Sequence, residues 1–241
     1  MMKITLLILI FIFIGLIYYF YFYEKPHKIY TFSPVINRLM KARSFSFLTK
    51  KECDYIIDIA EKNTWTRKRH KYYPTVDQEV KNIPELKFLY KKIHSKVFPI
   101  IKDNYGFTNV KINDFFIVKY DLTSDGMDKL DIHRDTSVLN FIVSLSSLDD
   151  YDGGGTFYPE FNLTVKPDKG EMFLNSGKLK HGGAKITKGT RYILIGFLDV
   201  FDKCINHDYL ESINFKIETP DLTVMNNIFY RQLDIYVINL E

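Results

Sequence analysis

The sequence predicts a mainly β fold of the α+β class, in which helices come first and strands follow. Hydrophobic residues recur at helical spacing between residues 49 and 97, and from residue 115 onward they recur at every second position. The strand-like segments are short and are separated by turn signals. Such a pattern indicates a double-stranded β-helix (jelly-roll) core of two packed sheets, with the N-terminal helices flanking it.

The composition fits one globular domain and gives no sign of a polyanionic partner. The 241 residues are 46% hydrophobic and 26% charged, which is enough apolar material for a sizeable core. The formal net charge is only +4, so we expect no nucleic-acid partner. Cys53 and Cys204 are too few for a disulfide framework and do not form a zinc-ligand pattern.

Residues 1–23 predict a transmembrane helix that anchors the protein in a membrane. Ile4 to Tyr23 is an unbroken uncharged run, and a helix of about 20 residues spans the roughly 30 Å hydrocarbon core of a bilayer. The run ends in aromatic residues, as is common at a membrane interface. A cleaved signal peptide is the alternative, but its apolar region would be shorter and would end in small residues. We therefore expect an uncleaved, single-pass anchor.

The residues after this run bear on orientation and on the domain boundary. Basic residues are more frequent after the run than before it, and the positive-inside rule would then keep the domain cytoplasmic. Residues 24–43, which contain Pro26 and Pro34, show no sustained period and are expected to form a linker. The basic residues are Lys3 before the run, and Lys25, Lys28, Arg38, Lys41 and Arg43 after it.

Two helices are expected next. The capping-box pattern Thr49-Lys50-Lys51-Glu52 opens the first helix. The second begins at Pro84, and we expect Pro99 and Gly106 to end it. Each helix has one apolar stripe, formed by Cys53, Ile56, Ile57 and Ala60 in the first and by Leu86, Leu89, Ile93 and Val97 in the second.

Five strands are expected in the rest of the domain. In the second strand the apolar residues alternate from Leu139 to Leu145, so that they share one face. Gly153-Gly154-Gly155 marks a tight turn or loop. These segments place the folded domain at residues 44–202, and residues 203–241 are expected to form a C-terminal extension packed on it. The strands are Phe115–Tyr120, Val138–Ser146, Phe161–Val165, Glu171–Asn175 and Arg191–Asp199.

Two histidines and a carboxylate form a pattern typical of a mononuclear iron site. His133 and Asp135 lie two residues apart, so on a strand both would point to one face. His181 supplies a third candidate ligand. Two His and one carboxylate leave three coordination positions open, as in non-haem Fe(II) oxygenases. Short motifs arise by chance, but the order, the spacing and the neighbouring strands together favour a metal site.

Arg191 is a candidate ligand for an organic acid. It shares a strand face with Ile193 and Ile195, where a cation is costly unless it is paired. A guanidinium group holds a carboxylate at two points, so a bound dicarboxylate would supply the pair. The alternative is an arginine at the mouth of the strand that reaches water or a nearby acid.

Several segments around these residues match one group of enzymes. They are Phe47–Cys53, Tyr72–Thr75, His133–Asp135, Asp150–Phe157, Gly177–Leu179, His181–Gly183 and Gly189–Ile193. Residues 44–199 thereby resemble the catalytic domain of 2-oxoglutarate/Fe(II)-dependent dioxygenases of the prolyl 4-hydroxylase and procollagen-lysyl hydroxylase group. Arg191 is closer to the lysyl hydroxylases, because collagen-type prolyl hydroxylases usually carry Lys there.

The resemblance implies roles for single residues. His133, Asp135 and His181 would bind Fe(II), and Arg191 would hold the distal carboxylate of 2-oxoglutarate. Tyr120 would help to hold this cosubstrate, although a strand aromatic packed in the core explains it equally well.

The resemblance also implies a reaction and a compartment. With dioxygen, the enzyme would hydroxylate a lysyl or prolyl side chain of a peptide or protein substrate and decarboxylate 2-oxoglutarate to succinate and CO2. Ascorbate would restore oxidised iron. The relatives suggest a domain in the lumen of the endoplasmic reticulum, against the cytoplasmic side that the charge bias favours.

Alternatives to this function stay open. The same chemistry could act on a free metabolite or a nucleic-acid base. A catalytically silent jelly-roll domain that only binds is the non-enzyme alternative, although all three candidate ligands and Arg191 are present. The basic run Trp65–Lys71 is most simply a solvated face, with the steering of an acidic substrate as the less favoured interpretation. The oligomeric state is not determined by the sequence.

Overall fold

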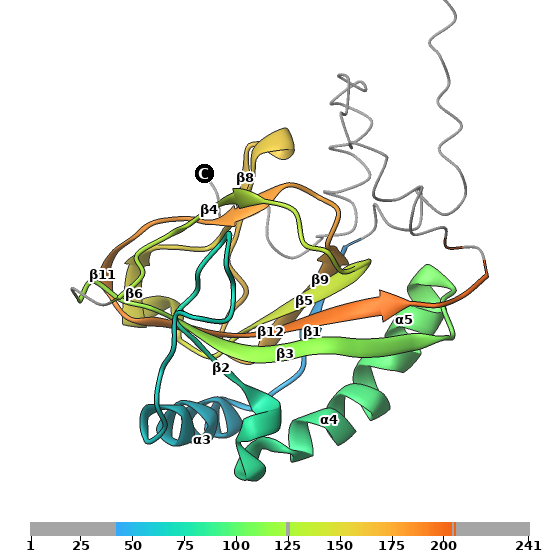
Figure 1. The fold of residues 1–241 in the computed structure, drawn as a ribbon, viewed down its shortest axis with the longest axis horizontal. Coiled ribbons are helices and arrows are strands. Elements are labelled where there is room, and N and C mark those ends of the chain that lie inside the picture. The colour runs from blue at the N-terminus through green and yellow to red at the C-terminus, as the bar shows by residue number, and fades with distance from the viewer. Residues whose placement is uncertain (1–41, 124–125, 204, 206–241) are drawn as a thin grey trace, which may run out of the picture. The chain divides into compact units, whose positions relative to one another are not determined.

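Two antiparallel sheets lie opposite one another in the computed structural model, which describes residues 42–123, 126–203 and 205 (Figure 1). The larger sheet has the strand order β1-β9-β5-β12-β3-β2, and the smaller sheet has the order β4-β10-β7-β8. The larger sheet comprises β1 (Arg43–Ser46), β2 (Asp77–Glu79), β3 (Val110–Tyr120), β5 (Leu139–Ser144), β9 (Glu171–Ser176) and β12 (Arg191–Val200). The smaller sheet comprises β4 (Leu130–His133), β7 (Thr156–Tyr158), β8 (Leu163–Val165) and β10 (His181–Gly183), and a separate pair is formed by β6 (Tyr151–Gly153) and β11 (Ile186–Gly189).

The path of the chain between the sheets is that of a jelly roll. From β3 in the larger sheet the chain crosses to β4, returns to β5, crosses to β7 and β8, returns to β9, crosses to β10 and ends in β12. Every crossing moves the chain between the two layers, so distant segments become neighbours. The predicted mainly β, jelly-roll architecture is therefore confirmed for the described residues.

The first predicted helix is α3 (Lys50–Glu61), and it begins as expected. The backbone N–H of Glu52 donates to Thr49 Oγ1 at 3.2 Å, and the Thr49 N–H donates to the Glu52 carboxylate at 2.8 Å. This reciprocal capping box satisfies two N–H groups that the first turn leaves without helical partners. Of the predicted stripe, Cys53, Ile56 and Ala60 are buried, and Cys53 is a free thiol.

The second predicted helix is less regular than expected and begins later, because Pro84 lies in a 3-10 turn (Pro84–Leu86) and the α-helix begins at Phe88. It consists of α4 (Phe88–Lys92), a π-helical turn (Ile93–Val97) and α5 (Phe98–Tyr105). The prediction that Pro99 ends the helix is wrong, since Pro99 lies in the first turn of α5. Proline lacks an N–H and its ring clashes with the preceding turn, and the wider π-helical turn before it accommodates both. Gly106 does end the helix, with a φ of 69° in the left-handed region that glycine tolerates.

The larger sheet separates two apolar clusters. On its outer face, the helices pack against residues such as Leu139, Phe141 and Leu194. On its inner face, Phe116, Ile142 and Ile193 form a second cluster that faces the smaller sheet. The predicted packing of the helices outside the jelly roll is confirmed, and β5 is buried on both faces.

Several short elements were not predicted. β1, β2, β4, β6, β7, β10 and β11 have only three or four residues each. A segment of that length shows no measurable hydrophobic period. Additional 3-10 turns cover Val80–Asn82, Pro84–Leu86, Leu148–Asp150 and Pro159–Phe161.

The predicted anchor (1–23), nearly all of the linker (24–43) and nearly all of the C-terminal extension (203–241) lie outside the described residues, as does Cys204. Their boundaries stay predictions. Within the part of the chain that the structure describes, no helix has the length and apolar character needed to cross a membrane.

Candidate metal centre

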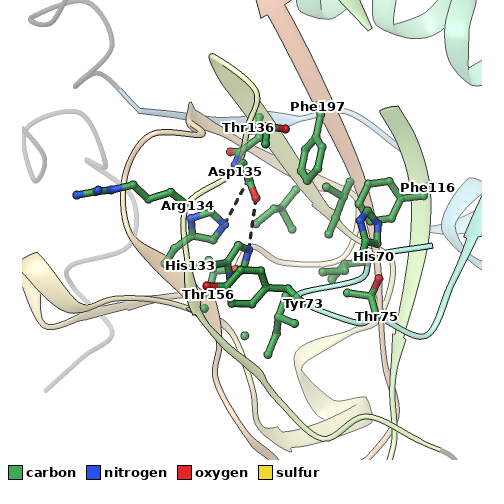
Figure 2. A pocket seen from close by; sticks show the side chains of 18 of the residues that line it. His70, Tyr73, Thr75, Phe116, His133, Arg134, Asp135, Thr136, Thr156 and Phe197 are labelled. Carbon is green, nitrogen blue, oxygen red and sulfur yellow. Dashed lines mark hydrogen bonds and ion pairs between the residues drawn. The ribbon is translucent and has the colours of Figure 1, made fainter. Parts of the chain in front are cut away.

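His133, Asp135 and His181 converge between the two sheets. The Nε2 atom of His133 lies 3.3 Å from Asp135 Oδ1, and the Nε2 atom of His181 lies 3.5 Å from Asp135 Oδ2. Each residue offers a ligand atom, and these atoms lie within 4.8 Å of one another. Figure 2 shows His133 turned toward the Asp135 carboxylate. The structure thus brings together the three residues that the sequence singled out.

The two histidines are neighbours across a strand pair. His133 ends β4, His181 begins β10, and the two are paired in the antiparallel register. Side chains directly opposite one another on such a pair lie on the same face, and their rings are 4.6 Å apart between centroids. Residues 48 positions apart are therefore fixed side by side by backbone pairing.

Asp135 reaches the site differently from the prediction. β4 ends at His133, so Asp135 lies beyond the strand and the expected alternation does not orient it. Its backbone N–H donates to the Gly177 carbonyl at 2.9 Å. A Cβ at Gly177 would lie 2.5 Å from the Ser137 carbonyl oxygen and 3.2 Å from the Asp135 Cβ, so this close approach requires glycine.

Backbone carbonyls set the tautomer of both histidines. The Nδ1–H of His133 donates to the Asp131 carbonyl at 2.7 Å, and the Nδ1–H of His181 donates to the Leu179 carbonyl at 2.9 Å. In the neutral form of each ring, Nε2 then carries the lone pair that a metal ion can accept. Metal-binding histidines are held in this manner, because the second hydrogen bond fixes the ring and its free nitrogen.

The charges of the cluster support one another. Burial raises the pKa of Asp135, but His181, His133 and the Asn140 amide outweigh burial, and the net shift is downward. Burial lowers the pKa of His133, but the hydrogen bond and charge of Asp135 outweigh it, and the net shift is upward. A carboxylate that stays ionised beside two imidazoles is a donor set suited to Fe(II).

Asn140 is a member of the site that the sequence analysis missed. It lies on β5, is buried, and donates a hydrogen bond from Nδ2 to Asp135 Oδ2. The signal was present, because Asn140 is a polar residue on the strand face opposite to Leu139 and Phe141. The sequence analysis gave that face no role, whereas the structure turns it toward the smaller sheet.

Arg191 is a buried cation without an anionic partner among the described residues. Its residue exposure is 1%, its Nη1 donates a long hydrogen bond of 3.5 Å to the Gly155 carbonyl, and its guanidinium also hydrogen-bonds to the Tyr120 side chain. Its Nε has no hydrogen-bond partner, and its guanidinium lies 5.2 Å from the Tyr120 ring. Tyr120 is its cross-strand partner in β3. A buried guanidinium without a counter-ion is costly, so this geometry favours an anion binding beside it.

A cavity of about 280 Å³ joins these groups. The three candidate ligands, Tyr120 and Thr156 line it, together with an apolar wall on the inner face of the larger sheet. Arg191 is not part of the lining, but Tyr120, whose ring it contacts, is. Figure 2 shows Phe116, Phe197, His70 and Tyr73 around the opening. This volume is near the lower end of the range of small-molecule pockets, which begins at about 300 Å³.

A loop covers one side of this cavity. Residues 67–76, here called the rim loop, are closed at their base by two backbone hydrogen bonds between Thr66 and Asp77. The loop places Arg69 to Tyr73 on the cavity wall, and the Tyr73 ring lies 4.7 Å from the His133 ring. The basic run interpreted as a solvated face therefore forms part of the mouth of the site.

Comparison with known proteins supports this assignment. The chain is 29% identical over 171 residues to procollagen-lysine,2-oxoglutarate 5-dioxygenase 1 of Gallus gallus, covering 64% of this chain and 23% of the relative. It is 26% identical over 190 residues to procollagen-lysine,2-oxoglutarate 5-dioxygenase 2 of Homo sapiens, covering 71% of this chain and 25% of the relative. The chain thus spans about a quarter of the length of these relatives. No protein-family model matches it.

Solved structures share the fold. A 2OG-Fe(II) oxygenase family protein from Burkholderia pseudomallei has a TM-score of 0.54 at 12% identity, covering 69% of this chain and 88% of that one. A Pseudomonas putida prolyl-4-hydroxylase has a TM-score of 0.51 at 13% identity, covering 68% of this chain and 96% of that one. The resemblance predicted from the motifs is confirmed by the sequence relatives, and the fold by the structures.

Proposed function

We propose, from this likeness to procollagen-lysine dioxygenases, that the chain is an Fe(II)- and 2-oxoglutarate-dependent dioxygenase. It hydroxylates a lysyl or prolyl side chain of a peptide and converts 2-oxoglutarate to succinate and CO2. The observation that carries the proposal is the convergence of His133, Asp135 and His181 in a cavity that Tyr120 also lines. The Tyr120 ring lies 5.2 Å from the guanidinium of a buried arginine that has no carboxylate partner among the described residues. A structural histidine cluster gives no reason for that arginine.

The three side chains fit an iron ion. Donor atoms on one face of such an ion lie about 3 Å apart, given bonds of about 2.1 Å. The two nitrogen-to-oxygen distances of 3.3 and 3.5 Å are close to that spacing. His133 and His181 would each bind through Nε2, and Asp135 through one carboxylate oxygen. The Asn140 amide would hold the second oxygen of Asp135 in place.

The cosubstrate would lie between the iron site and Arg191. Its distal carboxylate would neutralise the guanidinium and satisfy the Nε–H that has no partner. Tyr120 lines the cavity and contacts the guanidinium, so it would form one wall of this subsite. The near carboxylate and the keto oxygen of 2-oxoglutarate would face His133, Asp135 and His181.

The remaining residues would orient the peptide and exclude water. Iron, when bound, supplies activation of dioxygen coupled to decarboxylation of the oxoacid, and ascorbate would keep it reduced. The apolar wall of Phe116, Ile195 and Phe197 keeps the reacting side chain in a dry environment. Tyr73, whose ring lies tilted beside that of His133, would limit access to the site on the side of the rim loop.

The decisive experiment measures succinate release and peptide oxidation together. The full chain is incubated with Fe(II), 2-oxoglutarate, ascorbate and peptides that contain Lys-Gly or Pro, and the products are analysed by mass spectrometry. We expect the mass of one oxygen atom to appear on a lysyl or prolyl residue, in proportion to succinate.

Variants of the candidate ligands provide the control. His133→Ala and Asp135→Ala should lose both products while keeping the circular dichroism spectrum and cooperative unfolding of the wild type. Succinate without peptide oxidation would favour a free metabolite or a base as substrate. Absence of succinate and of an Fe(II)–oxoacid absorption band would leave a binding domain.

We further propose that residues 1–23 anchor this domain in a membrane. The unbroken uncharged run from Ile4 to Tyr23 supports the proposal. The full chain should stay in the membrane fraction after alkaline carbonate extraction, whereas a chain from which residues 1–23 are deleted should not. Protease treatment of sealed microsomes distinguishes the lumenal side, which the resemblance of the motifs implies, from the cytoplasmic side, which the basic residues after the run imply.

A further inference from the structure

The rim loop holds basic residues of two different kinds. Arg69 is tied down, since its Nη1 lies 3.2 Å from Asp77 Oδ1 and its Nη2 pairs with Asp114. Its guanidinium also lies 4.7 Å from the centroid of the Phe116 ring. Arg69 therefore attaches the first part of the rim loop to the larger sheet. Its positive charge is already compensated by these two carboxylates, so it is a poor site for an acidic ligand.

Arg67, Lys68 and Lys71 are different. All three are exposed, and none forms an ion pair with a described residue. Lys71 lines the catalytic cavity and lies 5.5 Å from the Tyr72 ring. Arg67 lines a second hollow between the rim loop and residues 121–123 and 126–131. Tyr72, Tyr73 and Leu130 line both hollows, so a peptide that leaves the cavity on this side passes Lys71 and Arg67 in turn.

The described acidic residues that line the second hollow each lie near a lysine. Asp121, Asp128 and Asp131 line the second hollow, and each has a lysine within ion-pair distance. The distances are 3.7 Å to Lys119, 3.1 Å to Lys185 and 3.1 Å to Lys129, respectively. Among the residues that the structure describes, Asp135 is the only carboxylate that lines the catalytic cavity, and it faces the two histidines. Among the described residues that line the two hollows, Lys71 and Arg67 are cations without an ion-pair partner.

We propose that the peptide substrate carries acidic residues next to the residue that is hydroxylated, and that Lys71 and Arg67 bind them. The inference rests on the proposed peptidyl hydroxylation and narrows its substrate class. An acidic flank gains two exposed ion pairs and is attracted to the cavity before contact, whereas a basic flank is repelled by the same residues.

The test uses the full chain and matched fluorescent peptides. One series is centred on Pro and one on Lys, and each has Glu, Gln or Lys on both sides of the central residue. Binding is measured by fluorescence anisotropy, and hydroxylation is measured separately by mass spectrometry as kcat/KM. For two exposed charge pairs we expect Glu-flanked peptides to exceed Gln-flanked ones roughly tenfold in both readouts at low salt, with Lys-flanked peptides weakest. The preference should shrink as salt is added.

The double variant Arg67→Gln/Lys71→Gln should reduce the preference for Glu to about twofold or less. Lys91→Gln removes an exposed charge of the same type on α4, where it lines none of the described hollows, and should leave the preference unchanged. Equal binding of all three flanks, a preference for Lys flanks, or an unchanged preference in the double variant would each overturn the proposal.

The two readouts separate this proposal from the proposed function. Hydroxylation without any flank preference would leave the enzyme assignment intact and remove the acidic substrate. A flank preference in binding without hydroxylation would retain the recognition surface and remove the peptidyl hydroxylase.

Discussion

Among single residues, Arg191 constrains the function most. It is the largest fully buried side chain of the described residues. It lies beside the Tyr120 and Tyr151 rings, at 5.2 and 6.0 Å from their centroids, instead of beside an acid. Ring contacts of this kind recover only part of the lost hydration of a guanidinium. The unpaired buried charge of Arg191 therefore lowers the stability of the ligand-free protein. A bound anion would offset this cost.

Arg191→Met should therefore separate binding from stability. Without its partner, the 2-oxoglutarate carboxylate should lose about 2–5 kcal/mol of binding free energy. The ligand-free protein should unfold at the same temperature as the wild type or at a higher one, because an unpaired buried charge has been removed. Calorimetric titration and thermal unfolding measure the two effects. Lys188→Gln, an exposed charge change on β11, is the control that should alter neither.

The pKa of His133 gives a second prediction at this scale. In the metal-free protein the hydrogen bond and charge of Asp135 outweigh burial and raise this pKa above its ordinary value of about 6.5. The pair thus contributes stability that is fully present below the ordinary pKa and is lost as the pH rises through the raised value. Nuclear magnetic resonance titration of the imidazole should show the upward shift, and Asp135→Asn should reverse most of it.

The same shift acts on metal binding with the opposite sign. Iron binds only the neutral imidazole, so protons compete with it. As the pH is lowered, the affinity for Fe(II) should therefore begin to fall at a higher pH than it would if His133 had an ordinary pKa. If the affinity for Fe(II) stayed constant while the pH was lowered through the raised pKa of His133, the ligand role of His133 would be contradicted.

Among the elements, the β4–β10 pair and the rim loop contribute residues to the site, whereas α3 stabilises the larger sheet from its outer face. α3 carries no site residue, but its capping box and its buried stripe attach it to the outer face of the larger sheet. The Lys92 ammonium also pairs with the capping Glu52 and so links α4 to the start of α3.

Thr49→Ala should destabilise the domain without changing its chemistry. Loss of the N-cap costs about 1 kcal/mol in typical helices. The free energy of unfolding in urea should fall by roughly that amount, and the dissociation constant for 2-oxoglutarate should stay the same. Thr64→Ala, an exposed position just after α3 with no cap to lose, should have no measurable effect on unfolding.

At the scale of the whole molecule, the two faces of the larger sheet have different roles. One face packs against the helices and stabilises the fold, and the other lines the cavity of the candidate site. Leu194 belongs to the apolar cluster on the helix side, and its neighbour Ile195 lines the cavity on the other side. Consecutive residues of one strand thus serve different purposes, because side chains alternate between faces.

Leu194→Ala and Ile195→Ala should consequently have contrasting effects. The first should lower the free energy of unfolding by about 2–5 kcal/mol, since it leaves a cavity in a closely packed region, and should leave the affinity for Fe(II) and 2-oxoglutarate unchanged below the unfolding transition. The second, at a half-buried position, should affect peptide turnover more than stability. Equal loss of stability in both variants would show that the sheet does not separate the two functions.

Much of the architecture was predictable because it depends on local pattern. The capping box of Thr49 and Glu52, the left-handed Gly106 and the long strand β12 are properties of short segments, and all were predicted correctly. The prediction that Pro99 ends the second helix was wrong, because the π-helical turn that accommodates this proline has no sequence signature of its own. Asn140 was missed because its face of β5 is covered by a sheet whose strands are too short to predict.

The sequence by itself determined the chemistry of the candidate site: two histidines, a carboxylate and an arginine, in an order that one group of enzymes shares. Only the tertiary structure decided how they meet. His133 and His181 are brought together by cross-strand pairing, Asp135 by a loop that approaches Gly177, and the basic run of the rim loop by its fixation through Arg69. The physical reason is that residue type sets what a side chain can bind, whereas its position depends on backbone pairing between segments far apart in the chain.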